Sequence, residues 1–283
     1  MQTVNGHWVD TLDPYLIRFG DGGMGIRWYG VAYAVGFLFA SWLLVRYWRK
    51  ERSRMDADAV SSLFVYLILG VMIGGRLGET VFYEWKHFVE RPMSVFEVWK
   101  GGMSAHGGFI GVAVAVVLFA RRHKLPLLHV GDCVVSAAPF GILLGRLANF
   151  VNGELWGKVS DAPWAVVFPM SRPGYPLDMI PPRHPSQLYE AAMEGVLLFA
   201  WMQWRVWKTE ALVRHRGRLV AEFLIGYGIL RCVGEVFREP DGSLVFGVLS
   251  RGTALSIVTA AIGIVLYACI LRAGREGEPK APR

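Results

Sequence analysis

The sequence is poor in charged residues and in cysteine, and each shortage excludes a class of protein. Charged side chains make up 19% of the 283 residues and hydrophobic ones 53%, whereas soluble domains carry about 25% charged residues. An ordinary soluble globule is therefore excluded. The three cysteines, Cys133, Cys232 and Cys269, are scattered through apolar runs, so we expect neither a disulfide framework nor a metal site.

Internal repeats and low-complexity tracts are also lacking, and we expect no cleavable signal peptide. Residues 1–27 are polar and rich in glycine, without the basic stretch and apolar core of a secretory signal. Residues 273–283 combine charge, glycine and proline, which is typical of a disordered tail.

The apolar residues come in blocks of about 20, the length of a helix that crosses a bilayer. Open sheets cannot span lipid with unpaired backbone groups. The predicted fold class is therefore all-α, a polytopic membrane protein forming a single integral-membrane domain over 1–283. The seven predicted transmembrane helices are 28–48, 59–83, 103–120, 130–150, 186–207, 219–237 and 252–271.

The net charge of +7 lies in alternate loops, which argues against a nucleic-acid-binding surface. Lys and Arg cluster after the first, third, fifth and seventh blocks, at 46–54, 121–124, 205–218 and 272–283. Such loops stay in the cytoplasm. The N-terminus is thus predicted to be periplasmic and the C-terminus cytoplasmic, with 151–185 as a periplasmic segment.

This topology brings polar residues of six helices to one level, the outer half of the bilayer. Both edges would carry such residues if they served only as anchors, so we predict a polar cavity that opens towards the outer leaflet. The residues at this level are Tyr29, Arg76, Glu79, Ser104, His106, Arg146, Asn149, His184, Gln187, Tyr189, Glu190, Glu194, Tyr227, Arg231, Glu235 and Arg238. The last four among them follow one helical stripe.

The stretch GRLANFVNGELWG at 145–157 carries the strongest signal. An arginine at the centre of a transmembrane helix costs roughly 2.5–3.5 kcal/mol, so Arg146 is a candidate functional residue. Asn149 and Asn152 follow at intervals of three and share its face while the helix lasts. The alternative is a helix end with a snorkelling arginine and an asparagine cap.

The other polar residues also allow structural interpretations. Arg231 with Glu235 can be an ion pair that holds helices together, and Arg76 with Glu79 a local pair. Glu190 and Glu194 can be partners of arginines.

His106, within GGMSAHGGFIG at 101–111, can be a base or a hydrogen-bonded anchor. The glycines around His106 allow another backbone or a lipid headgroup to approach closely.

Taken together, the motifs resemble those of the prolipoprotein diacylglyceryl transferase family. Besides 145–157 and 101–111, the matching pieces are WYG at 28–30, GGRLGETVFY at 74–83, RHPSQLYE at 183–190 and FLIGYGILRCVGEVFREPD at 223–241. They follow one another in the same order as in the family and extend over nearly the whole chain, whereas the sequence of residues 158–182 looks variable.

The resemblance implies seven transmembrane helices in the bacterial inner membrane and transfer of the sn-1,2-diacylglyceryl group of phosphatidylglycerol to the lipobox cysteine of a prolipoprotein. The products would be a thioether and glycerol phosphate, and no cofactor is implied. His106, Arg146 and Arg231 are the expected catalytic residues. Substrate-binding roles are expected for Tyr29, Arg146, Asn149, Glu154, Gly157, Tyr227, Glu235 and Arg238.

The chemistry suits these residue types. Arginine binds phosphate through a fork of donors, and fixed cations stabilise charge that builds on a departing phosphate ester. The attacking thiol can lose its proton to a histidine or have its pKa lowered by arginines, and the sequence leaves both open.

No G-x-S-x-G elbow is present, so we expect direct transfer. A lipid transporter or flippase is the alternative function, although transport sites lie near the midplane and commonly use repeats. A structural scaffold would not explain the shared polar level.

Overall fold

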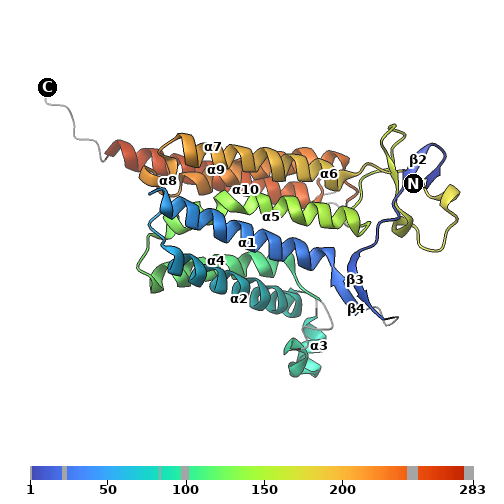
Figure 1. The fold of residues 1–283 in the computed structure, drawn as a ribbon, viewed down its shortest axis with the longest axis horizontal. Coiled ribbons are helices and arrows are strands. Elements are labelled where there is room, and N and C mark those ends of the chain that lie inside the picture. Colours follow the sequence, from blue (N-terminus) through green and yellow to red (C-terminus); the bar gives the residue numbers. More distant parts are fainter. Residues whose placement is uncertain (1, 21–23, 83, 97–101, 241–247, 277–283) are drawn as a thin grey trace. The chain divides into compact units, whose positions relative to one another are not determined.

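The computed structural model describes residues 2–20, 24–82, 84–96, 102–240 and 248–276, except for the side chains of 82, 105, 106 and 274–276. The chain divides into two compact units, one of Met1–Ala40 with Val134–Arg283 and the other of Ser41–Cys133. Helices dominate both units (Figure 1). The predicted helical class is confirmed.

Each predicted transmembrane block coincides with helical structure. The long helices are α1 (Trp28–Arg49), α2 (Ala57–Phe82), α4 (Ala105–Arg122), α5 (Leu127–Val151), α9 (Arg218–Phe237) and α10 (Arg251–Glu276). The block at 186–207 is formed by α6 (Ser186–Glu190), the π-helix η5 (Ala191–Leu197) and α7 (Leu198–Lys208), which follow one another without a break. Part of the predicted disordered tail is helical, because α10 continues to Glu276; its remainder, 277–283, lies outside the described residues.

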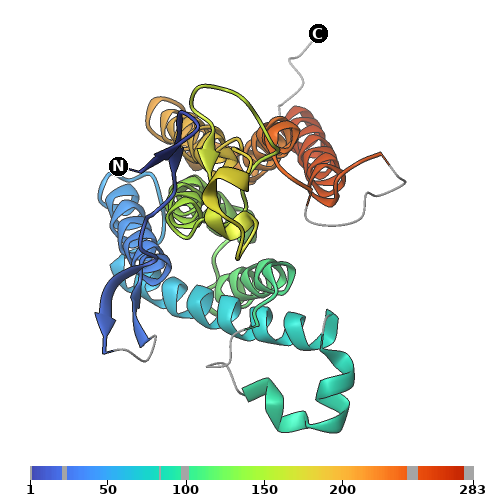
Figure 2. The ribbon, with the colours of Figure 1, turned by 90° about the vertical axis from the view of Figure 1, so that its right-hand side faces the viewer.

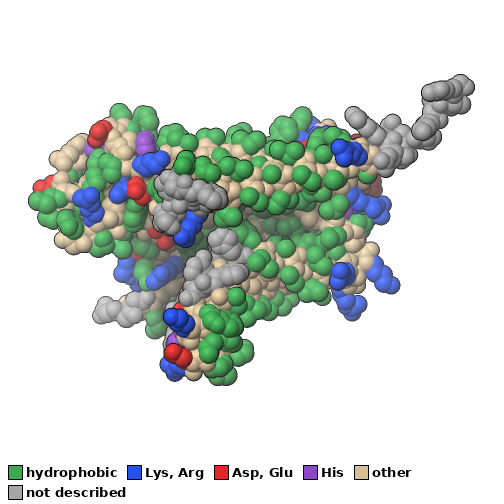
Figure 3. Space-filling view, turned by 180° about the vertical axis from the view of Figure 1, so that it is seen from behind, with side chains coloured by type: hydrophobic (Ala, Val, Ile, Leu, Met, Phe, Trp, Pro, Cys, Tyr) green, Lys and Arg blue, Asp and Glu red, His purple; other side chains and the backbone are tan. Residues whose placement is uncertain are grey.

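Four helices of the described chain are long and apolar enough to cross a membrane, namely α1, α2, α5 and α10. Hydrophobic side chains cover long stretches of the surface on the face that Figure 3 shows. In water such a surface would favour association, so the surface fits a bilayer. Polar side chains within α9 and the π-helical turn before α7 explain why these two segments look less like ordinary membrane spans.

In the larger unit, α6, α7 and α10 pack against α9, and α9 and α10 lie side by side (Figures 1 and 2). The N-terminal half of α1 packs on α5, where the rings of Phe39 and Phe140 are 3.9 Å apart. Close to it, η5 touches α5 through Gly195, where a β-carbon would lie 2.7 Å from Leu143 Cβ. This close approach brings the acidic residues of α6 and η5 to the polar end of α5.

Short strands, which the sequence analysis did not predict, precede α1. β1 (Thr3–Val4) pairs antiparallel with β2 (His7–Val9), and β2 pairs parallel with β5 (Val166–Val167). β3 (Tyr15–Phe19) and β4 (Met24–Arg27) form a separate hairpin. A small core of Val9, Val167 and Ile180 stabilises the three-stranded sheet, and the 3₁₀ turns η3 (Pro169–Ser171) and η4 (Leu177–Met179) follow β5.

In the smaller unit, α2 and α4 are in backbone contact. A β-carbon on Gly111 would lie 1.9 Å from the carbonyl oxygen of Gly70, and one on Gly107 would lie 2.2 Å from that of Gly74. Small residues at four-residue spacing allow membrane helices to pack this closely. The predicted close approach at the glycines of 101–111 is thus made by the backbone of α2. The remaining helices of this part are α3 (Trp85–Glu90) and η1 (Pro92–Phe96), and a further short helix of the larger unit is α8 (Ala211–Arg214).

Candidate active site

The end of α5 is shaped by a glycine cap. Gly153 adopts φ +60°, its N–H donates to the carbonyl of Phe150 at 3.0 Å, and the N–H of Glu154 donates to the carbonyl of Asn149 at 3.1 Å. These two bonds are the Schellman pattern. The reversal at Gly153 folds Glu154 back over the last turn of α5, so that its side chain meets Asn149.

Asn149 joins two other predicted site residues, Tyr29 and Glu154. Its Nδ2 donates to Tyr29 Oη at 2.8 Å and to Glu154 Oε1 at 2.9 Å. The backbone carbonyl of Glu154 accepts a bond of 2.6 Å from Gln187 Nε2 on α6. Because Asn149 is itself buried, these bonds fix its amide and hold the start of α1 against the end of α5.

Arg146 lies one helical turn before Asn149 and faces two carboxylates. Its Nη1 is 3.0 Å from Glu190 Oε2, and its Nη2 is 3.2 Å from Glu194 Oε2. Both acidic side chains are fully buried. The interpretation of Arg146 as a snorkelling anchor is therefore wrong, because its guanidinium contacts two buried carboxylates inside the helix bundle.

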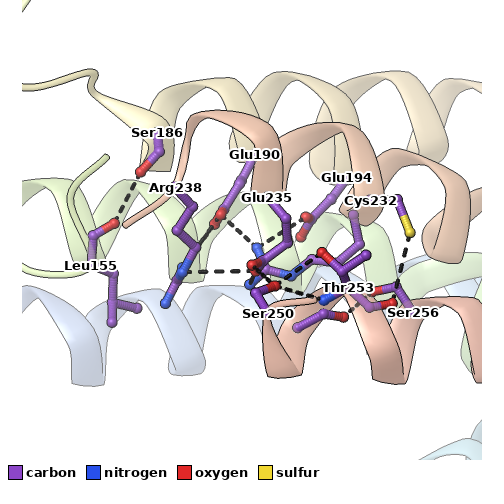
Figure 4. A network of polar contacts seen from close by, with 12 residues as sticks. Leu155, Ser186, Glu190, Glu194, Cys232, Glu235, Arg238, Ser250, Thr253 and Ser256 are labelled. Atoms are coloured by element: carbon purple, nitrogen blue, oxygen red, sulfur yellow. Dashed lines mark hydrogen bonds and ion pairs between the residues drawn. The ribbon is translucent and has the colours of Figure 1, made fainter. Parts of the chain in front are cut away.

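Glu190 contacts three arginines in a charged cluster, and Figure 4 shows it beside one of them, Arg238. Besides Arg146 it contacts Arg231, with 2.5 Å between Glu190 Oε1 and Arg231 Nη1, and Arg238, with 3.3 Å between the same oxygen and Arg238 Nη1. Arg231 also pairs with Glu235. The interpretation of Glu190 as a partner of arginines is confirmed. The interpretation of Arg231 with Glu235 as a pair between helices is wrong, because both residues lie on α9 and it is Glu190 on α6 that links Arg231 to another helix. Neither result excludes a role in substrate binding.

The start of α10 closes the cluster. Ser250 Oγ donates to Glu235 Oε2 at 2.5 Å and accepts from the N–H of Thr253 at 3.0 Å, which makes Ser250 the N-cap of this helix. A β-carbon on Gly252 would lie 2.5 Å from the Glu235 carboxyl carbon. Only glycine leaves room here for the Glu235 carboxylate.

Three arginines and three glutamates make up this cluster, so its formal charges cancel. The exposed fractions of the side chains are 16% for Arg146, 11% for Arg231 and 5% for Arg238. Isolated charges in a low-dielectric interior are costly, and mutual pairing is what allows them to be buried. A ligand from outside reaches Arg146 most easily.

Gly157 has a packing role in this structure. A β-carbon there would lie 2.5 Å from the carbonyl oxygen of Phe237 and 2.7 Å from His184 Cβ. Its N–H donates to the His184 carbonyl at 2.9 Å, and its carbonyl accepts from Arg183 Nη1 at 3.1 Å. Because Gly157 has no side chain, the residues after α5 can pass between Phe237 and His184. The substrate-binding role of Gly157 remains a prediction.

Outside the helices, Asp10 lies against the same glycine cap. Its Oδ2 would be 3.0 Å from a β-carbon on Gly153, and its Oδ1 accepts from the N–H of Leu12 at 3.1 Å. Burial raises the pKa of Asp10 from 3.8 to about 6, while the bond from Leu12 lowers it. The sheet β1–β2–β5 thereby supports the turn that carries Glu154.

Arg76, in the smaller unit, binds backbone. Its guanidinium donates to the carbonyls of Val95 at 3.0 Å, Ser94 at 2.5 Å and Gly102 at 3.2 Å. Ser104 caps α4 by accepting from the N–H of Gly107 at 3.3 Å. His106 lies in the first turn of α4, but its side chain is outside the described residues.

The structure thus brings together most of the predicted site. Tyr29, Asn149 and Glu154 form one hydrogen-bonded group, and the arginines with Glu235 form the other. Tyr227 lies one turn before Arg231 on α9, where its ring stacks on Phe223 with 5.8 Å between centroids. Glu190 and Glu194 were predicted at the shared polar level and as possible partners of arginines, but no catalytic or substrate-binding role was expected for them, although two acids four residues apart in an apolar block are a signal for one. No group of three His, Cys, Asp or Glu residues suited to a metal ion is found in the part of the chain that the structure describes.

Comparison with known proteins gives consistent matches over most of the chain. The family model described as prolipoprotein diacylglyceryl transferase matches residues 14–269. A phosphatidylglycerol–prolipoprotein diacylglyceryl transferase of Rhodospirillum centenum is 46% identical over 258 residues, which cover 89% of this chain and 90% of the relative. A relative with the same name in Pseudoalteromonas translucida is 44% identical, and the match covers 91% of this chain and 93% of the relative. Another in Haemophilus influenzae is 43% identical, with 87% of this chain and 88% of the relative covered. This chain belongs to the prolipoprotein diacylglyceryl transferase family.

Proposed function

We propose that this protein transfers the sn-1,2-diacylglyceryl group of phosphatidylglycerol to the cysteine thiol of a prolipoprotein lipobox. The observation that carries the proposal is the buried cluster in which Glu190 holds Arg146, Arg231 and Arg238. It offers fixed cations to an anionic headgroup within apolar helices. The names of the relatives supply the substrates.

The arginines would bind the phosphate of the lipid. A guanidinium has five N–H donors, more than the two carboxylate contacts of Arg146 engage. Because the carboxylates hold the guanidinium in place, little ordering is needed when a phosphate binds, and preorganised donors of this kind stabilise charge that develops in a transition state.

Buried acceptors suit the rest of the headgroup. Gln187 Oε1 and Glu194 Oε1 accept no hydrogen bond from the residues that the structure describes, although Glu194 Oε1 lies 3.5 Å from Arg231 Nη1 in an ion pair. Unsatisfied buried acceptors are costly, and the glycerol headgroup of phosphatidylglycerol carries hydroxyl donors. These two oxygens are our candidates for recognising that headgroup.

The reaction would be one displacement. The thiolate attacks the glycerol carbon, the C–S bond forms, and the C–O bond to phosphate breaks, so that its electron pair leaves with glycerol phosphate. The thiol proton passes to a base, for which His106 is our candidate, or its loss is favoured by the arginines. Arg146 and Arg231 would stabilise the departing phosphate, with Tyr29, Asn149, Glu154, Tyr227, Glu235 and Arg238 positioning them or the lipid.

We place the protein in the bacterial inner membrane with seven spans, a periplasmic N-terminus and the site in the periplasmic half. A periplasm-specific reporter fused at about residue 170 should be active, and one fused near residue 210 should be silent. The opposite pattern would overturn this orientation.

Purified protein in phosphatidylglycerol vesicles, given a lipobox peptide, tests the activity. We expect the peptide to gain the mass of one diacylglyceryl group and glycerol phosphate to appear in equal amount. A peptide with Ser in place of the lipobox Cys is the control. Movement of lipid between leaflets without peptide modification would instead support a flippase.

A further inference from the structure

The β3–β4 hairpin has one wholly apolar face. Cross-strand partners share a face of a sheet, and so do residues two apart along a strand. The register pairs Ile17 with Ile26 and Phe19 with Met24. These four side chains therefore lie together on one side of the hairpin, and we call them the apolar face.

This face is uncovered in the structure. The exposed fractions are 48% for Ile17, 55% for Phe19, 69% for Met24 and 42% for Ile26. A two-stranded hairpin without a packed face is marginally stable in water, and contiguous exposed apolar residues mark an interaction surface. The hairpin thus needs a partner for these four residues.

The opposite face is polar and makes its own contacts. Arg18 binds the Asp13 carboxylate through Nε at 3.1 Å and Nη2 at 2.7 Å. The guanidinium carbons of Arg18 and Arg27 lie 4.7 and 4.9 Å from the ring centroid of Tyr15, and Arg27 donates to Tyr15 Oη at 2.8 Å. The tyrosine ring lies over Gly25, where a β-carbon would be 2.7 Å from Tyr15 Cδ1. The two faces therefore differ as sharply as those of an interfacial amphipathic helix.

The chain connection fixes where this hairpin lies. β4 ends at Arg27 and α1 begins at Trp28, with no residue between them (Figure 1). At about 3.3 Å per residue, Ile26 lies within roughly 7 Å of the first residue of a helix apolar enough to span a membrane. Trp28 is 39% exposed, which suits the interfacial position that tryptophan prefers. The apolar face thus lies close to the start of α1.

We propose that this face inserts into the bilayer interface at the N-terminal end of α1, with the Tyr15–Arg18–Arg27 face turned to water. The occupant of the face is lipid, and neither a second copy of the chain nor the signal peptide of a substrate is required. Because Tyr29 follows the hairpin directly, such an anchor would also set the depth of Tyr29 in the membrane. The proposal depends on α1 crossing the membrane and not on the proposed activity.

Spin labels on the two faces test the proposal. In protein whose three native cysteines are replaced by alanine, Met24→Cys labels the apolar face and Arg18→Cys the polar one. In vesicles of phosphatidylglycerol and phosphatidylethanolamine, collisions with oxygen should exceed those with a water-soluble nickel complex at position 24, and the order should reverse at position 18. Higher nickel accessibility at position 24, or low accessibility to both reagents, would overturn the proposal.

A second measurement keeps the native cysteines. A photoreactive benzoylphenylalanine at position 24, illuminated in membranes, should give adducts with the mass of a phospholipid. Adducts with a second copy of the chain or with another protein, in place of lipid, would contradict the assignment of this face to the bilayer.

Discussion

Replacing Glu190 by Gln should cost this protein both stability and activity. The side chain is completely buried and contacts three guanidinium groups, with N–O distances of 3.0 Å to Arg146, 2.5 Å to Arg231 and 3.3 Å to Arg238. The variant keeps the size of the side chain but removes one of three negative charges. Three arginines would then face two carboxylates.

The expected loss follows from the burial of this cluster. Removing one partner of a buried ion pair destabilises a protein by about 3–5 kcal/mol, because an uncompensated charge remains inside. An exposed pair such as Arg183 with Glu239, whose carboxylate side is 49% exposed, contributes about 0–1 kcal/mol. We therefore expect Glu190→Gln to unfold at clearly lower denaturant concentration in mixed micelles than Glu239→Gln.

Glu222 provides the matched control for activity. It is also largely buried and binds two arginines, with 2.7 Å to Arg205 Nε and 3.1 Å to Arg218 Nε. On α9 it lies nine residues before Arg231, about 14 Å along the helix axis. Glu222→Gln should lower stability but keep the transfer rate per folded molecule, whereas Glu190→Gln should lose most of it.

The reasoning is refuted if Glu190→Gln unfolds like the wild type, or if its transfer rate per folded molecule stays near the wild-type value. The first result would mean that the cluster is not held together by this charge. The second would mean that the arrangement of the three arginines does not matter for transfer.

Three further predictions concern Glu235, His106 and Asp10. Glu235→Gln should keep part of the activity with an unchanged pH profile, because Glu235 positions Arg231 without moving a proton; a shifted profile would argue for direct proton transfer. If His106 is the base, His106→Gln should lower the rate about 10²–10⁴-fold, and the acidic limb of the pH–rate profile should disappear. An active variant that keeps this limb would instead indicate that the arginines lower the pKa of the thiol. Asp10 has a folded-state pKa of about 6, above its unfolded value of 3.8, so folding favours its protonated form. Its contribution to the free energy of unfolding is therefore complete below pH 3.8 and is lost as pH rises through 6. Thermal unfolding should therefore show wild type gaining stability relative to Asp10→Asn between pH 7 and pH 4, and a constant difference would contradict the assignment.

Hydrophobic patterning predicts the helices well, because burial in lipid demands long apolar runs with all backbone groups bonded internally. Helical spacing also predicts that Arg146 and Asn149 lie one turn apart on α5 and that Arg231 can pair with Glu235, as the structure shows. The asparagine cap that the sequence analysis allowed at the end of α5 is wrong, since the residue at the reversal is Gly153, with a φ of +60°.

Other features depend on contacts between distant segments. Strand β2 pairs with β5 over more than 150 residues of sequence, as in the pairing of Trp8 with Val166, and no local pattern specifies such a partner. The π-helical segment η5, which carries Glu194, is a rare conformation that hydrophobic periodicity does not predict. Similarly, periodicity cannot show that Glu190 contacts three arginines at once, since Arg146 comes from α5, Arg231 from α9 and Arg238 from the end of α9.

The transfer rate of the two arginine variants tests the central claim most directly. Initial rates of thioether formation on a lipobox peptide would be measured in phosphatidylglycerol vesicles for wild type, Arg146→Lys and Arg231→Lys, each corrected for its folded fraction. Lysine keeps the charge but lacks the planar fork of donors. Both variants should insert and fold yet lose most of the activity, and near-normal rates in both would show that these arginines do not bind the phosphate as proposed.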